Sequence, residues 1–388
     1  MTIAMIGQKG LPARSGGVER HVALLATGLA SRGHRVIVYG RSWYAQPSAL
    51  PEGIEQRLTQ GIRTKYLDAI THGWTALMDV RSQHPDIIHL HGTGVALLTP
   101  VARLVCPRAK LVVTFHCQDW KLSKWRGFGW AFRLGEWFAC HFSDRAITVS
   151  QALVEYCVEQ YGCQPTYIPH PFSIPQETPS SERLARHDLK SGQYLLFVGR
   201  LIADKQAHLL IDAYAMAKQA YPDLFADIQL VLVGGASWTD SYAKWLSRYA
   251  AQTPGVKMLG ECLGEELATL QAHARGHVFP TSSEGMSVAI LEAAGYRQPM
   301  VVSAIPQNHE ATGGHAIYVT SMSVRELCQG IVELVSMPEA QRQAMGERLR
   351  QHVAKTFGYR DRIDDMCRMY AELLGGDARL VTPIQKIA

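Results

Sequence analysis

Short apolar runs alternate with helical segments along the whole chain, and this alternation restricts the available folds more than any other feature. The runs predict strands at 3–7, 36–39, 87–90, 111–115, 146–149, 195–198, 228–233, 256–259, 277–280 and 300–302. Helical spacing of apolar residues separates many of them, as in 18–31, 151–161 and 207–221. Strands that are apolar on both faces are typical of parallel sheets covered by helices. The sequence therefore predicts an α/β fold with doubly wound parallel sheets.

The chain has more residues than usually fold around a single hydrophobic core. It has 388 residues, whereas single cores stop growing at about 250–300 residues. Prolines concentrate at positions 165, 169, 171, 175 and 179, which favours a linker there. We expect a first domain at 1–172 and a second at 183–355. The segment 356–388 is expected to brace the two domains or to cross back to the first.

Composition excludes several classes of protein. Hydrophobic residues make up 47% of the chain, yet no apolar run has the roughly 18 residues that a membrane-spanning helix needs. The net charge of +5 is modest and the charges are well mixed, so nucleic acid is not the expected partner. The eight cysteines form no C-x-x-C pair, so we expect buried thiols and no metal site. Met1 leads directly into a predicted strand, so we expect a cytoplasmic enzyme without a signal peptide.

Two glutamates eight positions apart are the first candidate binding residues. Glu284 lies in the turn after the strand predicted at 277–280, and Glu292 lies on the helix predicted at 287–296. The first turn of that helix offers free backbone amides, which together with the helix dipole suit a phosphate. The two carboxylates would then be available for neutral hydroxyl groups. This division predicts a ligand that joins a sugar and a ribose through a diphosphate.

Two cations follow another predicted strand. Gly199 and Arg200 come directly after the strand at 195–198, and Lys205 lies five residues after Arg200. Open α/β sheets bind ligands at the carboxyl ends of their strands. Cations at that edge would stabilise negative charge that develops on a departing phosphate.

A glycine-rich turn near the start of the chain is a further candidate. The strand at 3–7 is followed by a long turn of small residues, and Gly16 and Gly17 open the helix at 18–31. Glycines in such a turn allow the backbone to approach a phosphate without a Cβ in between. The G-x-G-x-x-G spacing of dinucleotide-binding proteins is absent.

These motifs, in this order and at these separations, resemble the retaining nucleotide-sugar glycosyltransferases of family 4, which have the GT-B fold. The resemblance implies two Rossmann-like domains that face a central cleft. It implies that Glu284 holds hydroxyls of the donor sugar and that Glu292 holds the nucleotide ribose. Arg200 and Lys205 would neutralise the diphosphate. Further implied donor-binding residues are Gly16, Gly17, Gly199, Gly285, Met286, Ser287 and Val288.

The first half of the chain resembles one bacterial branch of that family, the rhamnosyltransferase-like enzymes of surface polysaccharides. The resemblance rests on the segment 6–19 and on the run from His116 to Trp125. It implies that His116 lies near the reacting carbon and binds sugar or acceptor, and that Asp119 and Trp120 contact the acceptor. The second half departs from that branch, because Glu284-Gly285-Met286-Ser287 stands where the branch has a Gly-Gly-Thr-Asn-Pro type of segment.

The reaction expected from the resemblance is a same-face displacement without metal. The chain has no D-x-D pattern, and the departing diphosphate itself would take the acceptor proton. We expect a hexosyl- or deoxyhexosyltransferase with no cofactor, since the nucleoside-diphosphate sugar is a substrate. The alternatives are a GT-B epimerase or phosphorylase, or a non-catalytic module that binds a nucleotide sugar. The residues name neither the sugar nor the base, and they leave the acceptor open between a glycan and a lipid-linked saccharide.

The segment 120–142 is a candidate for contact with an anionic membrane surface. It combines eight Trp and Phe residues with Lys121, Lys124, Arg126 and Arg133, a composition typical of interfacial helices. The same aromatics could instead pack in the core of the first domain. Membrane contact would place the enzyme at the inner face of the plasma membrane.

Overall fold

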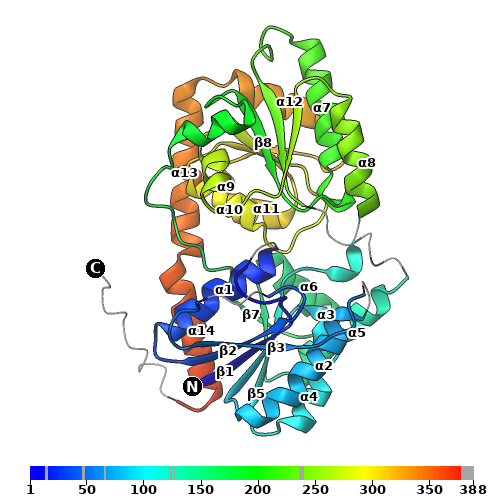
Figure 1. Cartoon of the computed structure of the whole chain (residues 1–388), viewed down its shortest axis with the longest axis vertical. Coiled ribbons are helices and arrows are strands. Elements are labelled where there is room, and N and C mark those ends of the chain that lie inside the picture. Colours follow the sequence, from blue (N-terminus) through cyan, green and yellow to red (C-terminus); the bar gives the residue numbers. More distant parts are fainter. Residues whose placement is uncertain are drawn as a thin grey trace. The chain divides into compact units, whose positions relative to one another are not determined.

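The computed structural model describes residues 1–13, 16–45, 49–64, 67–122, 125, 127–235 and 240–376. They divide into two compact units, Met1–Pro171 with Phe357–Ala388, and Phe172–Thr356. Each unit is built around one parallel sheet, as Figure 1 shows. The predicted doubly wound α/β architecture is therefore confirmed.

The first unit holds a seven-stranded sheet in the order β3-β2-β1-β4-β5-β6-β7, with every pair of neighbours parallel. Its strands are β1 (Thr2–Ile6), β2 (Arg35–Arg41), β3 (Ile54–Thr59), β4 (Ile87–His91), β5 (Lys110–Phe115), β6 (Arg145–Thr148) and β7 (Thr166–Tyr167). Its helices are α1 (Gly17–Ala30), α2 (Asp68–Val80), α3 (Thr93–Ala96), α4 (Thr99–Val105), α5 (Gly129–Phe142), α6 (Gln151–Tyr161) and α14 (Tyr359–Leu373), with short 3-10 turns at Arg81–Gln83 and Asp119–Lys121.

The second unit holds a six-stranded sheet in the order β10-β9-β8-β11-β12-β13, again all parallel. Its strands are β8 (Tyr194–Val198), β9 (Gln229–Val233), β10 (Val256–Gly260), β11 (Gly276–Phe279), β12 (Met300–Ser303) and β13 (Ile317–Val319). Its helices are α7 (Ala207–Ala220), α8 (Asp240–Ala251), α9 (Gly264–Ala272), α10 (Val288–Gly295), α11 (Pro306–Thr312), α12 (Val324–Ser336) and α13 (Glu339–Phe357), with 3-10 turns at Ser181–His187 and Ala203–Lys205.

In both units the strand order reverses beside the first strand. The chain moves outward from β1 to β2 and β3, and then returns to place β4 on the other side of β1. The second unit repeats this with β8, β9 and β10 on one side and β11 on the other. Ligands of open α/β sheets bind at such a reversal, outside the carboxyl ends of the strands. The fold thus marks one candidate binding edge in each unit, at β1/β4 and at β8/β11.

The last helix, α14, belongs to the first unit although it follows the second in sequence. Its residues Ile363, Met366 and Tyr370 are almost fully buried and share one core with Ile3 and Met5 of β1 and with apolar residues of α1. Helix α1 accommodates it through Gly28, where a Cβ would lie 2.5 Å from Ile363 Cδ1. The apolar side of α14 therefore forms part of the core of the first unit.

The segment 120–142 is divided between core and surface. Glu136 and Ala139 of α5 are fully buried. At other positions of the segment, Phe128, Trp130, Leu134, Trp137 and Phe142 remain at least 38% exposed, and Trp130 reaches 67%. Lys124 and Arg126, two of the four cations assigned to this segment, lie outside the described residues. Across the described residues, every helix is too short or too polar to cross a lipid bilayer.

Candidate active site

The edge at β8/β11 collects the donor-site candidates that lie in the second unit. Strand β8 ends at Val198, so Gly199 and Arg200 lie directly at its carboxyl end, and Lys205 ends the 3-10 turn that follows. Strand β11 ends at Phe279, and the loop after it carries Glu284 to the start of α10. The parallel pairing of β8 with β11 brings these two loops to the same edge of the sheet.

Lys205 and Glu284 form an ion pair through Nζ and Oε1. Their side chains are 17% and 12% exposed, respectively. The loops that carry them are joined at the Asp204 carbonyl, which accepts hydrogen bonds from the Ser282 amide at 3.0 Å and the Ser282 hydroxyl at 3.1 Å. The charge of Lys205 is thus matched by Glu284. An incoming phosphate would have to compete with Glu284 for the ammonium group.

Arg200 is the second cation at this edge. Its side chain is partly exposed and has no ion-pair partner within the described part of the chain. The backbone beside it is held in place, because the Leu201 amide donates to the Gly235 carbonyl at 3.0 Å and the Gly199 amide donates to the Val233 carbonyl at 3.0 Å. Arg200 therefore extends from a fixed loop and remains available to an anion.

Close backbone packing explains the glycines of this edge. Gly234, at the end of β9, has φ of +153°, and a Cβ there would lie 1.8 Å from the Gly199 carbonyl oxygen. No side chain fits between the two loops, so the chain after β8 lies directly against the chain after β9. The sequence assigned Gly199 to the donor site, but its contact with Gly234 was not apparent from the sequence.

Glu292 lies in the second turn of α10 and is 6% exposed. Its Oε2 accepts a hydrogen bond of 2.8 Å from Gln271 Nε2 of α9, which fixes the orientation of the carboxylate. Gly285, Met286 and Ser287 are also buried. Val288, the first residue of α10, is half-buried. The Ser287 side chain makes no capping hydrogen bond to α10, and the first amides of a helix have no intrahelical acceptor.

In the first unit, Gly16 precedes α1 with φ of +101°, and Gly17 is the first helical residue. A Cβ at Gly16 would lie 2.1 Å from Glu19 Oε2. The side chain of Glu19 therefore folds back over the turn. Arg14 and Ser15, which belong to the same motif, lie outside the described residues.

The candidate acceptor residues Asp119 and Trp120 are engaged in contacts within their own unit. Asp119 Oδ2 accepts a hydrogen bond of 2.9 Å from Thr93 Oγ1. Trp120 Nε1 donates to Tyr156 OH at 2.9 Å, and that hydroxyl donates to Glu136 Oε2 at 2.7 Å. Burial raises the pKa of Glu136, while the two tyrosine hydroxyls that bond to it act in the opposite direction. These contacts position the turn after β5.

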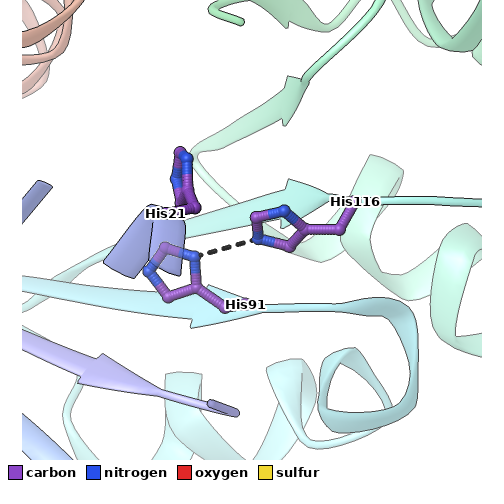
Figure 2. Close-up of side chains that lie close together, drawn as sticks. All are labelled: His21, His91 and His116. Atoms are coloured by element: carbon purple, nitrogen blue, oxygen red, sulfur yellow. Dashed lines mark hydrogen bonds between the residues drawn. The ribbon is translucent and has the colours of Figure 1, made fainter. Parts of the chain in front are cut away.

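His116, directly after β5, lies in a group of buried histidines that the sequence did not predict. The others are His21 of α1, His91 at the end of β4 and His170 after β7. Figure 2 shows His21, His91 and His116 together at the carboxyl edge of the first sheet. The sequence did not predict the group because its members are far apart along the chain. Three of the four histidines lie at or just beyond strand ends, and this shared position is the one sequence feature that could have indicated the group.

Comparison with known proteins decides the family. The model of Glycosyltransferase Family 4 matches residues 15–174, and the model of Glycosyl transferases group 1 matches residues 192–337. The chain therefore carries a Glycosyltransferase Family 4 domain followed by a Glycosyl transferases group 1 domain. It is therefore a glycosyltransferase, and the expectation from its motifs is confirmed at that level.

Relatives of this glycosyltransferase cover nearly its whole length. Glycogen synthase of Mycobacterium tuberculosis is 26% identical in an alignment of 391 positions that covers 90% of this chain and 90% of the relative. Among solved structures, sucrose-phosphate synthase from Thermosynechococcus elongatus aligns with a TM-score of 0.83 at 19% identity and covers 96% of this chain and 99% of that one. Anabaena Alr3699/HepE in complex with UDP-glucose aligns with a TM-score of 0.75 at 20% identity, covering 97% and 99%. The fold is thus GT-B.

Proposed function

We propose that this glycosyltransferase moves a hexosyl or deoxyhexosyl group from a nucleoside-diphosphate sugar to a saccharide or lipid-linked saccharide of a cell-surface polysaccharide, with retention of anomeric configuration. The observation that carries the proposal is the Lys205–Glu284 ion pair at the strand-order reversal of the second unit, beside Arg200, which has no ion-pair partner among the described residues. The resemblance of residues 6–19 and 116–125 to bacterial surface-polysaccharide enzymes supports the acceptor class.

The proposed step needs no metal at the donor. The bond from the anomeric carbon to the β-phosphate oxygen breaks, and the acceptor hydroxyl oxygen bonds to the same face of that carbon. The acceptor proton passes to the departing phosphate oxygen. Arg200 and Lys205 stabilise the charge that grows on the phosphate, and Glu284 holds hydroxyls of the transferring sugar by a contact that strengthens as the sugar leaves the phosphate. Glu292, oriented by Gln271, holds the ribose.

The direct test combines donor choice with stereochemistry. A thermal-shift screen over UDP-, GDP-, dTDP- and ADP-sugars identifies the donor that stabilises the protein. NMR of the first product formed from that donor then reports the anomeric configuration. A product with inverted configuration would contradict the proposed displacement, and the absence of both transfer and slow donor hydrolysis would favour a binding module.

The two glutamates are expected to give different phenotypes. Glu284→Gln should lower kcat by about 10²–10³-fold, the loss typical of one preorganised transition-state contact. It should leave the affinity for free nucleoside diphosphate equal or tighter, because Lys205 loses its competing partner. Glu292→Gln should weaken that same affinity by about 10-fold or more, because a hydrogen bond to a charged group contributes about 1.5–3 kcal/mol.

Calorimetry with the diphosphate identified by the screen separates these outcomes. Glu347→Gln is the matched control, since Glu347 is a surface carboxylate in an ion pair with Arg297 in the same unit. Equal diphosphate affinity in wild type and Glu292→Gln would remove the ribose role. A marked loss of affinity in Glu284→Gln would show that Glu284 contacts the nucleotide instead of the sugar.

We further propose that helix α5 and the turn before it rest on an anionic membrane where the lipid-linked acceptor lies. Trp130 and Trp137 of α5 expose 67% and 40% of their surface. Lys121 Nζ and the Arg133 guanidinium each lie 5.4 Å from the centre of the Trp120 ring. Exposed aromatics beside cations are the composition of interfacial segments. Each cation near such a surface contributes about 1 kcal/mol, which gives reversible docking.

Binding to phosphatidylglycerol vesicles is therefore expected to fall steeply as salt rises. It should also fall in a Lys121/Lys124/Arg126/Arg133→Ser variant and in Trp130→Ser/Trp137→Ser, with turnover on a water-soluble acceptor retained. Trp245→Ser, at an exposed tryptophan of α8, is the matched control. If the α5 variants sediment with vesicles as well as wild type does, the enzyme reaches its acceptor through another surface.

A further inference from the structure

An apolar pocket lies beside helix α2 in the first unit. Its volume is about 560 Å³, within the range of about 300–1,000 Å³ that small-molecule sites usually have. The apolar side chains in its wall are Ile62, Ile70, Trp74 and Leu98. Ile62 belongs to the loop that follows the carboxyl end of β3, and Ile70 and Trp74 lie in the first two turns of α2. The pocket thus lies where β3 ends and α2 begins.

The polar groups in the wall of the pocket bond to one another. Thr71 Oγ1 accepts a hydrogen bond of 2.9 Å from the Ile62 amide and donates to the Leu67 carbonyl at 2.7 Å. Thr75 Oγ1 donates to the Gln60 carbonyl at 2.5 Å. Both hydroxyl hydrogens are therefore used within the wall. A sugar would lose its water here without gaining equivalent hydrogen bonds, so the pocket favours a hydrocarbon.

Close packing at two glycines holds the loop and the helix that form the pocket. A Cβ at Gly61 would lie 3.0 Å from His72 Cβ, so the loop after β3 lies directly on α2. A Cβ at Gly73 would lie 2.7 Å from Val95 Cγ2 and 2.8 Å from Leu98 Cδ1. Helix α2 in turn therefore lies directly on α3 and the residues after it. The packing of the unit itself forms the pocket.

A cation lies next to the pocket. Arg63, which directly follows Ile62, is exposed, and its Cζ lies 4.8 Å from the centre of the Trp43 ring. Trp43 Nε1 donates at 3.2 Å to Oδ1 of Asp68, the first residue of α2. The Arg63 guanidinium is thus held beside the start of α2. Asp68 is already paired with Arg41 at 2.7 Å, which leaves the charge of Arg63 for another anion.

The pocket is open on the side of the first sheet that also carries α5 and its exposed tryptophans. Figure 1 shows α2, α3, α4 and α5 together on that side. Helix α3 joins the other two, since a Cβ at Gly94 would lie 3.3 Å from Phe132 of α5 and 3.9 Å from Ala69 of α2. Ile62 and Trp74 in the pocket wall are 54% and 48% exposed. A hydrocarbon chain can therefore enter from the surface proposed to rest on the membrane.

We propose that this pocket binds the hydrocarbon chain of a lipid-linked acceptor, and that Arg63 pairs with the phosphate that joins the chain to the saccharide. This assignment rests on the proposed function and selects the lipid-linked saccharide from its two acceptor classes. The pocket lies at the same edge of the sheet as the reversal at β1/β4, two strands away. Neighbouring strands are about 4.7–4.9 Å apart, so a saccharide can bridge the distance of about 10 Å.

Binding of short alkyl phosphates to the full-length protein tests the pocket without a transfer reaction. Calorimetry with butyl, hexyl and octyl phosphate, each below its micelle concentration, should show affinity that rises about fourfold for each methylene buried. Octanol should bind more weakly than octyl phosphate, because it lacks the charge that pairs with Arg63. Inorganic phosphate reports anion sites elsewhere, and its affinity should be the same in wild type and in the pocket variants.

Surface variants locate the binding. Trp74→Ser and Ile62→Ser should each weaken octyl phosphate binding by more than 10-fold. Arg63→Gln should weaken it by about 10-fold and leave octanol binding unchanged. Met78→Ser is the matched apolar control, because Met78 is 42% exposed one turn after Trp74 and lies outside the pocket wall. Arg81→Gln, at the opposite end of α2, is the control for charge.

Kinetics connect the pocket to transfer. A saccharide with a phosphate-linked chain should be used with a higher kcat/KM than the same saccharide without the chain. Trp74→Ser should lower this ratio by more than 10-fold, whereas Met78→Ser should leave it unchanged. If no acceptor is glycosylated although octyl phosphate binds as expected, the proposed function is refuted and the pocket remains a lipid-phosphate site. If transfer occurs with a ratio that Trp74→Ser does not change, the pocket has no part in acceptor binding.

Two further results would overturn the assignment. One is an affinity of the wild type that does not depend on chain length, or that falls equally in Trp74→Ser and Met78→Ser. The other comes from sedimentation, where a wild-type dimer that Trp74→Ser dissociates would show that a second copy of the chain covers the pocket. Because the chain-length series is measured on the wild type, it decides the matter even where a variant misfolds.

Discussion

Arg200→Ala and Lys205→Ala are each expected to lower kcat by about 10²–10³-fold, and their combination by more. Both cations lie at the carboxyl edge of β8, where ligands of such sheets bind. Removing one preorganised group that stabilises developing negative charge costs about 3–4 kcal/mol of transition-state stabilisation. Steady-state kinetics at saturating donor measure the effect.

The two variants should differ in their effect on donor binding. Arg200 has no ion-pair partner within the described residues, so its whole charge is available to a diphosphate. Lys205 is already paired with Glu284, so part of its interaction with a phosphate replaces an existing one. Arg200→Ala should therefore raise the donor Kd more than Lys205→Ala does, while kcat falls in both.

Arg297→Ala and Lys218→Ala serve as controls. Arg297 pairs with Glu347 on the surface of the same unit, and Lys218 contacts Tyr214 in α7. Each should retain kcat within about twofold, because surface substitutions of this kind have small effects. Near-wild-type turnover in Arg200→Ala/Lys205→Ala would remove both residues from the active site.

The fold could be predicted from the sequence because the strands of a doubly wound sheet are buried on both faces. The expected helix at 151–161 has the bounds of α6, and the strand expected at 36–39 is the centre of β2. Segments with a weaker pattern were missed. Strand β3 lies at the sheet edge and has no fully buried position, with Glu55 and Arg57 pointing to the surface beside Arg35 and Asp79. An edge strand of this composition gives no apolar signal.

The candidate site at the β8/β11 edge could be predicted from the sequence, whereas the histidine cluster of the first unit could not. Arg200, Lys205 and Glu284 stand at strand ends within recognisable motifs, so sequence order indicated their edge of the sheet. The ion pair between Lys205 and Glu284 depends on hydrogen bonds between two loops, which no spacing reveals. His21, His91 and His170 are spread over 150 positions of sequence. Only the strand order of the first sheet brings them together.

The second large effect is expected in stability. Tyr370 of α14 is fully buried in the core that it shares with β1 and α1. Tyr370→Ala removes an aromatic ring from that core, which costs about 3–5 kcal/mol in comparable sites. It also leaves His89 Nδ1 without its hydrogen-bond partner. Tyr370→Phe keeps the ring and removes only the hydroxyl, so about 1–3 kcal/mol is expected.

Denaturant unfolding followed by tryptophan fluorescence measures these changes. Six of the eight tryptophans, at positions 43, 74, 120, 125, 130 and 137, belong to the first unit, so the signal reports mainly the unit that contains α14. Tyr221→Ala, at a tyrosine that is 50% exposed at the end of α7, should change stability by less than about 0.5 kcal/mol.

The comparison between the two Tyr370 variants separates packing from hydrogen bonding. If α14 is an integral part of the first core, the ring accounts for most of the loss and Tyr370→Phe is the milder change. A loss below about 1 kcal/mol in Tyr370→Ala would mean that α14 adds little to that core, since full burial of an aromatic ring predicts several times more. In that case the first sheet would be stable without the helix that returns to it from the end of the chain.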